Sequence, residues 1–143
     1  GGYKMEYKKF GNKFVVRLDK GEEIVETLKK FCRENNLSLG GITGIGSTNK
    51  VKIGLFSTSE KKYYGREFTG DYEITALNGN ISTMNEEVYL HIHISIADDA
   101  HTTYGGHLNY AFISGTCEII IDAIEGNVDR VFDQGVGLNI YKF

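Results

Sequence analysis

The chain of 143 residues contains no proline and only two cysteines, and no apolar stretch in it approaches the length of a membrane helix. Without proline, many of the turns fall to the 18 glycines. Cys32 and Cys117 lack the spacing of a disulfide framework, so we expect two reduced thiols that pack as small apolar groups. A membrane-spanning helix needs roughly 18 apolar residues in a row, so the sequence predicts none.

The chain also lacks the strong basic excess of a free-standing duplex-DNA-binding protein. Its formal net charge is −3. Residues 1–67 carry 14 basic and 8 acidic side chains (+6), whereas residues 68–143 carry 2 and 11 (−9). These halves could attract each other within or between subunits, or their charges could interleave on solvated strand faces after folding. The first five residues contain no apolar stretch like that of a secretion signal, so we expect a cytoplasmic location.

The segment after Asp19 predicts the one clear helix of the chain. Asp19 resembles an N-cap, and Glu22 completes a pattern like a capping box. An apolar stripe at helical spacing follows and consists of Ile24, Val25, Leu28, Phe31 and Cys32. We expect this amphipathic helix to end near Asn35-Asn36.

Strand-like segments occupy most of the remaining chain. Tyr3–Phe10 and Lys13–Leu18 predict a hairpin around Gly11-Asn12. Further strands are expected over residues 39–47, 51–57, 62–68, 72–81, 87–97, 112–123 and 129–142. The glycines of segment 40–46 lack a P-loop ending and indicate close approach between neighbouring backbones. One helix among many short strands predicts an α+β fold with a mainly antiparallel, curved, barrel-like sheet.

Three of the four histidines lie in or shortly after one strand-like segment, residues 87–97. His91 and His93 lie two residues apart in an apolar, β-branched run, so both imidazoles project from the same face of the predicted strand. His107 follows Gly105-Gly106, which we interpret as a turn that folds back beside them. Three converging neutral imidazoles are suitable ligands for a divalent metal, most simply zinc with an open fourth position. The alternative is a hydrogen-bonded histidine cluster at a subunit interface.

Several other side chains could take part in a site at the histidines. Asp98 and Asp99 could orient the imidazoles, although Ala-Asp-Asp-Ala is more typical of a turn. Tyr104 could line a pocket, although packing is the simpler role. His101 lies beside the loop and is expected to be exposed. An enzyme would need a general base, and the candidates are Glu73, Asp98 and Glu118, none of which the sequence places near the histidines.

Five segments, in the same order, resemble the plant-and-prokaryote conserved (PPC) domain family, and in particular its stand-alone bacterial and archaeal members. They are Asp19–Leu28, Gly40–Gly46, Gly70–Asn80, His91–Leu108 and Gly115–Ile121. The resemblance implies one PPC-like domain over residues 3–143, assembled as a homotrimer. It also implies that the histidines hold a metal, as they do in some prokaryotic members. A cupin site is the weaker match, because its second histidine lies much farther downstream than His107.

The resemblance links the family to DNA through the AT-hook segments of its plant members. Their Arg-Gly-Arg-Pro core is absent from this sequence. Our leading hypothesis is therefore a binding or regulatory protein, linked to transcription through protein partners, with a metal at His91, His93 and His107. The alternative is a metal-dependent enzyme that acts on a small molecule. A third hypothesis, direct DNA binding, would rest on Lys4, Lys8, Lys9, Lys13, Lys61 and Lys62.

Overall fold

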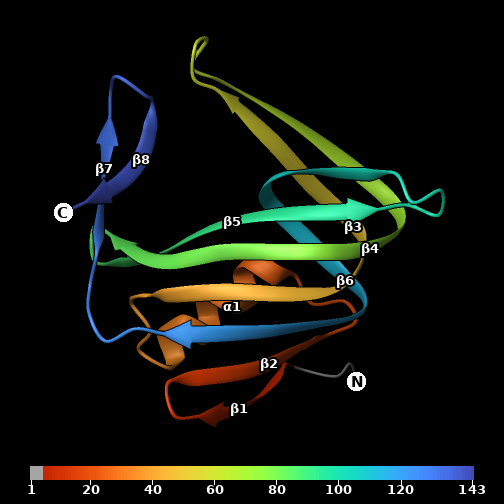
Figure 1. Ribbon diagram of the computed structural model, residues 1–143, viewed down its shortest axis with the longest axis horizontal. Helices are drawn as coiled ribbons and strands as arrows, with labels where there is room; N and C mark the ends of the chain where they lie inside the picture. The colour runs from red at the N-terminus through yellow and green to blue at the C-terminus, as the bar shows by residue number, and fades with distance from the viewer. Residues whose placement is uncertain (1–4) are drawn as a thin grey trace.

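The structure is a computed structural model that describes residues 5–143 (Figure 1). The chain folds into one helix, α1 (Ile24–Glu34), and eight strands within these residues. The strands are β1 (Glu6–Phe10), β2 (Lys13–Asp19), β3 (Gly40–Ser57), β4 (Lys62–Met84), β5 (Glu87–Ala97), β6 (Thr103–Ala123), β7 (Asp129–Asp133) and β8 (Leu138–Lys142).

Four long strands close into a ring by antiparallel pairing. Strand β3 pairs with β4, β4 with β5, β5 with β6, and β6 again with β3. The β1–β2 hairpin extends the sheet beyond β6, and the β7–β8 hairpin joins β4 through one parallel pair, Thr83 with Asp129. This topology confirms the predicted α+β fold with a curved, barrel-like antiparallel sheet. In Figure 1 the β7–β8 hairpin and the outer ends of β3 and β4 rise from the same side of the ring.

Strand β5 places its two sets of side chains on opposite faces, as the alternation of the sequence predicts. Ile92, Ile94 and Ile96 are buried in the core. His91 and His93 lie on the other face, where His93 is exposed and His91 half-buried. The period of two therefore separates the core from the histidine site along one strand.

Helix α1 buries the predicted apolar stripe, including Leu28 and Phe31, against β5 and β6. Its start differs from the prediction. The N-cap is Glu23, whose carboxylate accepts the N–H groups of Val25 and Glu26 at 2.9 and 2.8 Å. The predicted cap, Asp19, ends β2 instead and donates its backbone N–H to Glu22 at 2.9 Å. Half of the capping pattern forms, but it closes a turn before the helix.

Several strand boundaries also differ. Segments 39–47 and 51–57 form the single strand β3, because the polar stretch between them makes a bulge and not a turn. There the buried Thr48 donates its hydroxyl to the Phe112 carbonyl at 2.7 Å. Segments 62–68 and 72–81 likewise merge into β4, whereas 129–142 divides into β7 and β8. The Gly11 hairpin is confirmed from Glu6 onward, and the expected start at Tyr3 lies outside the described residues.

The two cysteines are buried, as the sequence analysis expects. Cys32 and Cys117 are free and buried, and burial raises the pKa of each thiol to about 12.

Among the ion pairs of residues 5–143, Lys13 with Asp122 (3.2 Å) joins the two halves of the chain, and the others lie within the first half. Ion pairing between the two halves of the chain is therefore limited to this one pair among residues 5–143. In the described part of the chain, no helix has the length and apolarity required to cross a membrane.

Candidate metal centre

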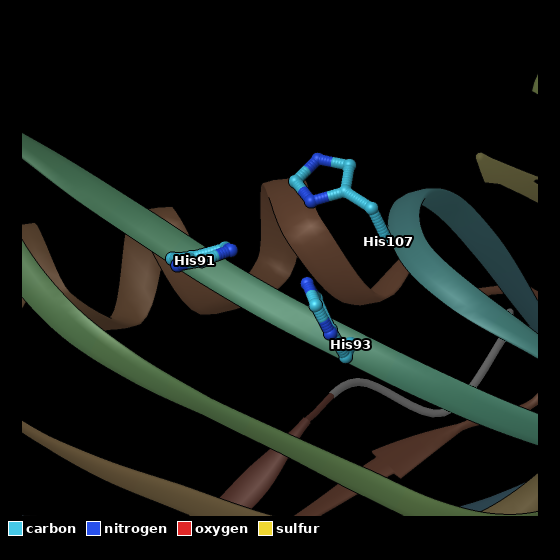
Figure 2. A group of neighbouring side chains, drawn as sticks. All are labelled: His91, His93 and His107. Carbon is cyan, nitrogen blue, oxygen red and sulfur yellow. The ribbon is translucent and has the colours of Figure 1, made fainter. Parts of the chain in front are cut away.

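His91, His93 and His107 lie together on the outer face of β5 and the start of β6 (Figure 2). Their ring centroids are 5.0 Å apart for His91 and His93, and 5.7 and 5.8 Å from His107 to each. One nitrogen from each ring lies within 4.8 Å of the other two. Figure 2 shows the three rings around a common space, with nitrogens directed into it. The predicted clustering is confirmed.

The route by which His107 reaches this cluster differs from the prediction. Gly105 and Gly106 are not a turn but part of β6, between β5 and β3. A Cβ at Gly105 would lie 2.9 Å from the Ile94 carbonyl oxygen, and one at Gly106 would lie 2.6 Å from that of Gly54. Glycine thus permits the close approach of three backbones. As a result, His107 sits directly across from its register partner His93.

The protonation of His91 and His107 suits metal binding. Burial, followed by the proximity of His93 and Arg130, lowers the pKa of His91 below its ordinary value of 6.5. Burial and then His93 lower that of His107 in the same way. Both imidazoles are therefore neutral at pH 7, which is the form that binds a metal.

The size of the cluster also fits a metal ion. Tetrahedral coordination with metal–nitrogen bonds of 2.0–2.1 Å requires nitrogens about 3.3 Å apart. The imidazole nitrogens lie within 4.8 Å of one another, and ring rotations can bring them closer. The three residues could thus hold a divalent cation such as zinc, with a fourth position directed to solvent.

A cavity of about 600 Å³ opens over the histidines. Its walls come from four places: the outer ends of β3 and β4, the strand β5, the start of β6, and the β7–β8 hairpin. Apolar and aromatic side chains dominate the lining, namely Leu55, Phe56, Tyr63, Tyr89, Phe132 and Leu138. This volume is typical of a site for a small molecule.

Arg130 is the functional candidate that the sequence analysis missed. Its side chain reaches from β7 toward the ring, is 8% exposed, and lines a second hollow together with His91 and His107. It donates hydrogen bonds to Ser82 Oγ (2.8 Å), Asn80 Oδ1 (2.8 Å) and the Asn139 carbonyl (2.9 Å). A lone arginine in a short polar strand has no sequence pattern that would reveal this position.

The other residues considered from sequence do not join the site. Asp98 is a turn residue, as favoured, because its Oδ1 accepts the N–H groups of Ala100 and Thr102 at 3.0 Å. His101 is exposed in the same loop with a φ of 64°. Tyr104 packs against Phe68, with ring centroids 5.0 Å apart. The three candidate general bases, Glu73, Asp98 and Glu118, are not among the residues that line the cavity.

The described residues thus form a small α+β domain with a closed antiparallel ring, one helix and a histidine trio on its outer face. Residues 5–125 match the sequence profile of the Plants and Prokaryotes Conserved (PCC) domain, here abbreviated PPC. The chain belongs to this family.

Three crystal structures show the same fold over nearly the whole chain. One is a candidate DNA-binding protein of Bacteroides thetaiotaomicron, 37% identical, with a TM-score of 0.95 and coverage of 99% of both chains. A metal-containing protein of Archaeoglobus fulgidus is 30% identical, with a TM-score of 0.88 over 97% of this chain and 98% of that one. A PPC protein of Pyrococcus horikoshii is 26% identical, with a TM-score of 0.85 over 97% and 94%.

Among curated sequences, the chain is also similar to a part of a much longer protein. The chain is 28% identical, over 87% of its length, to the bifunctional protein GlmU of Synechococcus sp. strain JA-3-3Ab. It spans 19% of that protein, so it covers about a fifth of the length of the curated relatives it matches.

Proposed function

We propose that this chain is a metal-binding PPC protein in which His91, His93 and His107 hold one divalent ion, with zinc as the expected metal. The observation that carries the proposal is the set of three imidazole nitrogens within 4.8 Å of one another. The metal-containing relative from Archaeoglobus fulgidus, 30% identical, supports it. When bound, the ion would supply a Lewis-acidic centre with an open position beside the cavity.

The test is a calorimetric zinc titration of metal-free, tag-free protein and two variants. The unaltered protein should bind one zinc per chain, and H93A should lose this stoichiometric binding. Because His93 is exposed on the outer face of β5, its removal leaves the core intact. H101N is the matched control, since His101 is exposed in a loop and asparagine tolerates its left-handed backbone. Zinc binding by H93A equal to that of H101N would refute the site.

We further propose that the protein assembles as a homotrimer, as its resemblance to the family implies. Exposed apolar side chains on the outer face of β2, β6 and β3 support an interface. Val15 and Ile120 are register partners and each is 48% exposed, and Ile45 on β3 is 59% exposed. Light scattering should give three times the 16.0 kDa mass of the chain. I120E should lower that mass, whereas I124E, at an exposed position after β6, should not.

Within this assembly we propose a binding or regulatory role, in the cytoplasm and through protein partners. Direct DNA binding is the less favoured role. Lys4 lies outside the described residues, and the other five lysines of that hypothesis divide between the β1–β2 hairpin and the tip of the β3–β4 arm. These two segments lie at opposite ends of the molecule (Figure 1).

The second candidate function is a metal-dependent enzyme, which the cavity of about 600 Å³ above the histidines favours. No carboxylate lines that cavity within the described residues. Tyr63 lines the cavity, and its ring centroid lies 6.1 Å from that of His107. Its hydroxyl donates to the Asn109 side-chain oxygen. Burial raises the pKa of Tyr63, so this group would act as a proton donor and not as a base. Turnover that depends on both His93 and Tyr63 would identify an enzyme.

A further inference from the structure

Arg130 is a buried cation with uncharged surroundings. The faces of its guanidinium are covered by Tyr89 and Tyr141, whose ring centroids lie 4.7 and 4.5 Å away. No ion pair among residues 5–143 includes it. A guanidinium has five N–H donors, and three are engaged by neutral oxygen acceptors. A cation removed from water without an anionic partner is unfavourable, which indicates that a partner from outside the chain completes the site.

The guanidinium and the histidines face the same space. Arg130, His91 and His107 line one hollow of about 380 Å³. This hollow shares five lining residues with the larger cavity: Tyr89, His91, His107, Leu138 and Asn139. The two hollows therefore adjoin, and a molecule that occupied both would contact the open side of the histidine trio and Arg130.

The charge of this combined space selects the ligand. Neither hollow is lined by an aspartate or glutamate. A divalent ion at the trio together with Arg130 would place three positive charges in a mainly apolar pocket. Carboxylate and phosphate groups match both a guanidinium fork and an open metal position.

We propose that this cavity binds a small organic anion. Its carboxylate or phosphate group would lie between Arg130 and the metal, and its apolar body would pack against Phe56, Phe132 and Leu138. This inference rests on the proposed metal site. A purely structural Arg130, which only ties the β7–β8 hairpin to β4, would give the pocket no preference for anions beyond that of the metal.

The experiment uses the whole chain, metal-free or loaded with Co²⁺, whose visible spectrum reports ligands at the metal. Benzoate and phenyl phosphate are the anionic probes, and benzamide is the neutral probe of similar shape. In cobalt-loaded protein, one anion should bind at least tenfold more tightly than benzamide and change the spectrum. The tighter of the two anions identifies carboxylate or phosphate as the preferred group. In metal-free protein the same preference should persist at lower affinity, because Arg130 remains.

Two variants isolate the arginine. R130Q should weaken anion binding about ten- to a hundredfold, the usual effect of losing a charge-assisted hydrogen bond, and R130K should lose less. R66Q is the matched control, because Arg66 also stacks on an aromatic ring, that of Phe68, but lines neither hollow. Its anion affinity should equal that of the unaltered protein.

The outcomes separate the two proposals. Absence of stoichiometric cobalt would overturn the metal site, and the metal-free comparison of benzoate with benzamide would still test the arginine. Cobalt bound with no preference for either anion would overturn the anion proposal alone. Equal binding of benzoate and benzamide to metal-free protein would overturn the role of Arg130, even if R130Q fails to fold.

Discussion

Gly79→Ala tests how closely β4 must approach the strand that carries His91 and His93. Gly79 lies opposite Ile92 in the β4–β5 register. An added Cβ would lie 2.4 Å from the His91 carbonyl oxygen and 2.9 Å from Ile92 Cα. Both are backbone atoms of a paired strand, so no change of rotamer can relieve the clash.

The expected cost is at the upper end of the overpacking range, about 2–3 kcal/mol of unfolding free energy. For a chain of this length that corresponds to a fall in Tm of roughly 6–9 °C. Gly41→Ala is the matched control in the same sheet, because its added Cβ meets nothing within 4 Å. There the methyl group should leave stability unchanged or raise it by about 0.4–1 kcal/mol, through the unfolded chain.

The assay is urea unfolding of metal-free protein, followed by circular dichroism. G79A should unfold at lower urea than the unaltered protein, and G41A should not. Since the clash displaces β5 at His91, G79A should also bind zinc more weakly. Equal urea midpoints for G79A and G41A would refute the argument that close strand approach at Gly79 positions the site.

Two further predictions concern titratable groups. Burial lowers the folded-state pKa of His91 and His107 below the ordinary 6.5, so the unfolded chain binds more protons between the two values. Metal-free protein should therefore lose stability as the pH falls from about 6.5 through the lower folded-state pKa values of the two histidines. The loss should appear as a falling urea midpoint. The H91Q/H107Q double variant should lose part of this dependence of the urea midpoint on pH. An unchanged dependence in the double variant would contradict the assignment. The thiols of Cys32 and Cys117, with pKa raised to about 12 by burial, should react with a thiol reagent only when the protein unfolds, and rapid reaction of the native protein would contradict their burial.

The parts of the fold that were predicted correctly depend on local periodicity. The helix stripe around Leu28 and the alternation of β5 each place apolar residues on one face, and burial of that face follows directly. The pairing of His91 with His93 on the outer face of β5 follows from the same period of two. These features need no knowledge of which strand lies beside which.

The features that the sequence analysis predicted wrongly or missed depend on interactions between distant segments. Gly105-Gly106 has the composition of a turn, but β5 and β3 on either side hold it in a strand. Thr48 lies in a polar stretch that resembles a loop, yet the carbonyl of Phe112, 64 residues away, anchors it in β3. Arg130 reaches the histidine site only through the docking of β7 on β4. Register between strands, which local sequence does not specify, decides all three.

The most direct test of the central claim is the metal content of tag-free protein purified without a metal column, measured by elemental mass spectrometry. The account predicts about one divalent ion, most simply zinc, for each chain of unaltered protein and of H101N, and essentially none for H93A. Absence of metal in all three, with no uptake when zinc is added, would contradict the account and leave the histidines as a structural cluster.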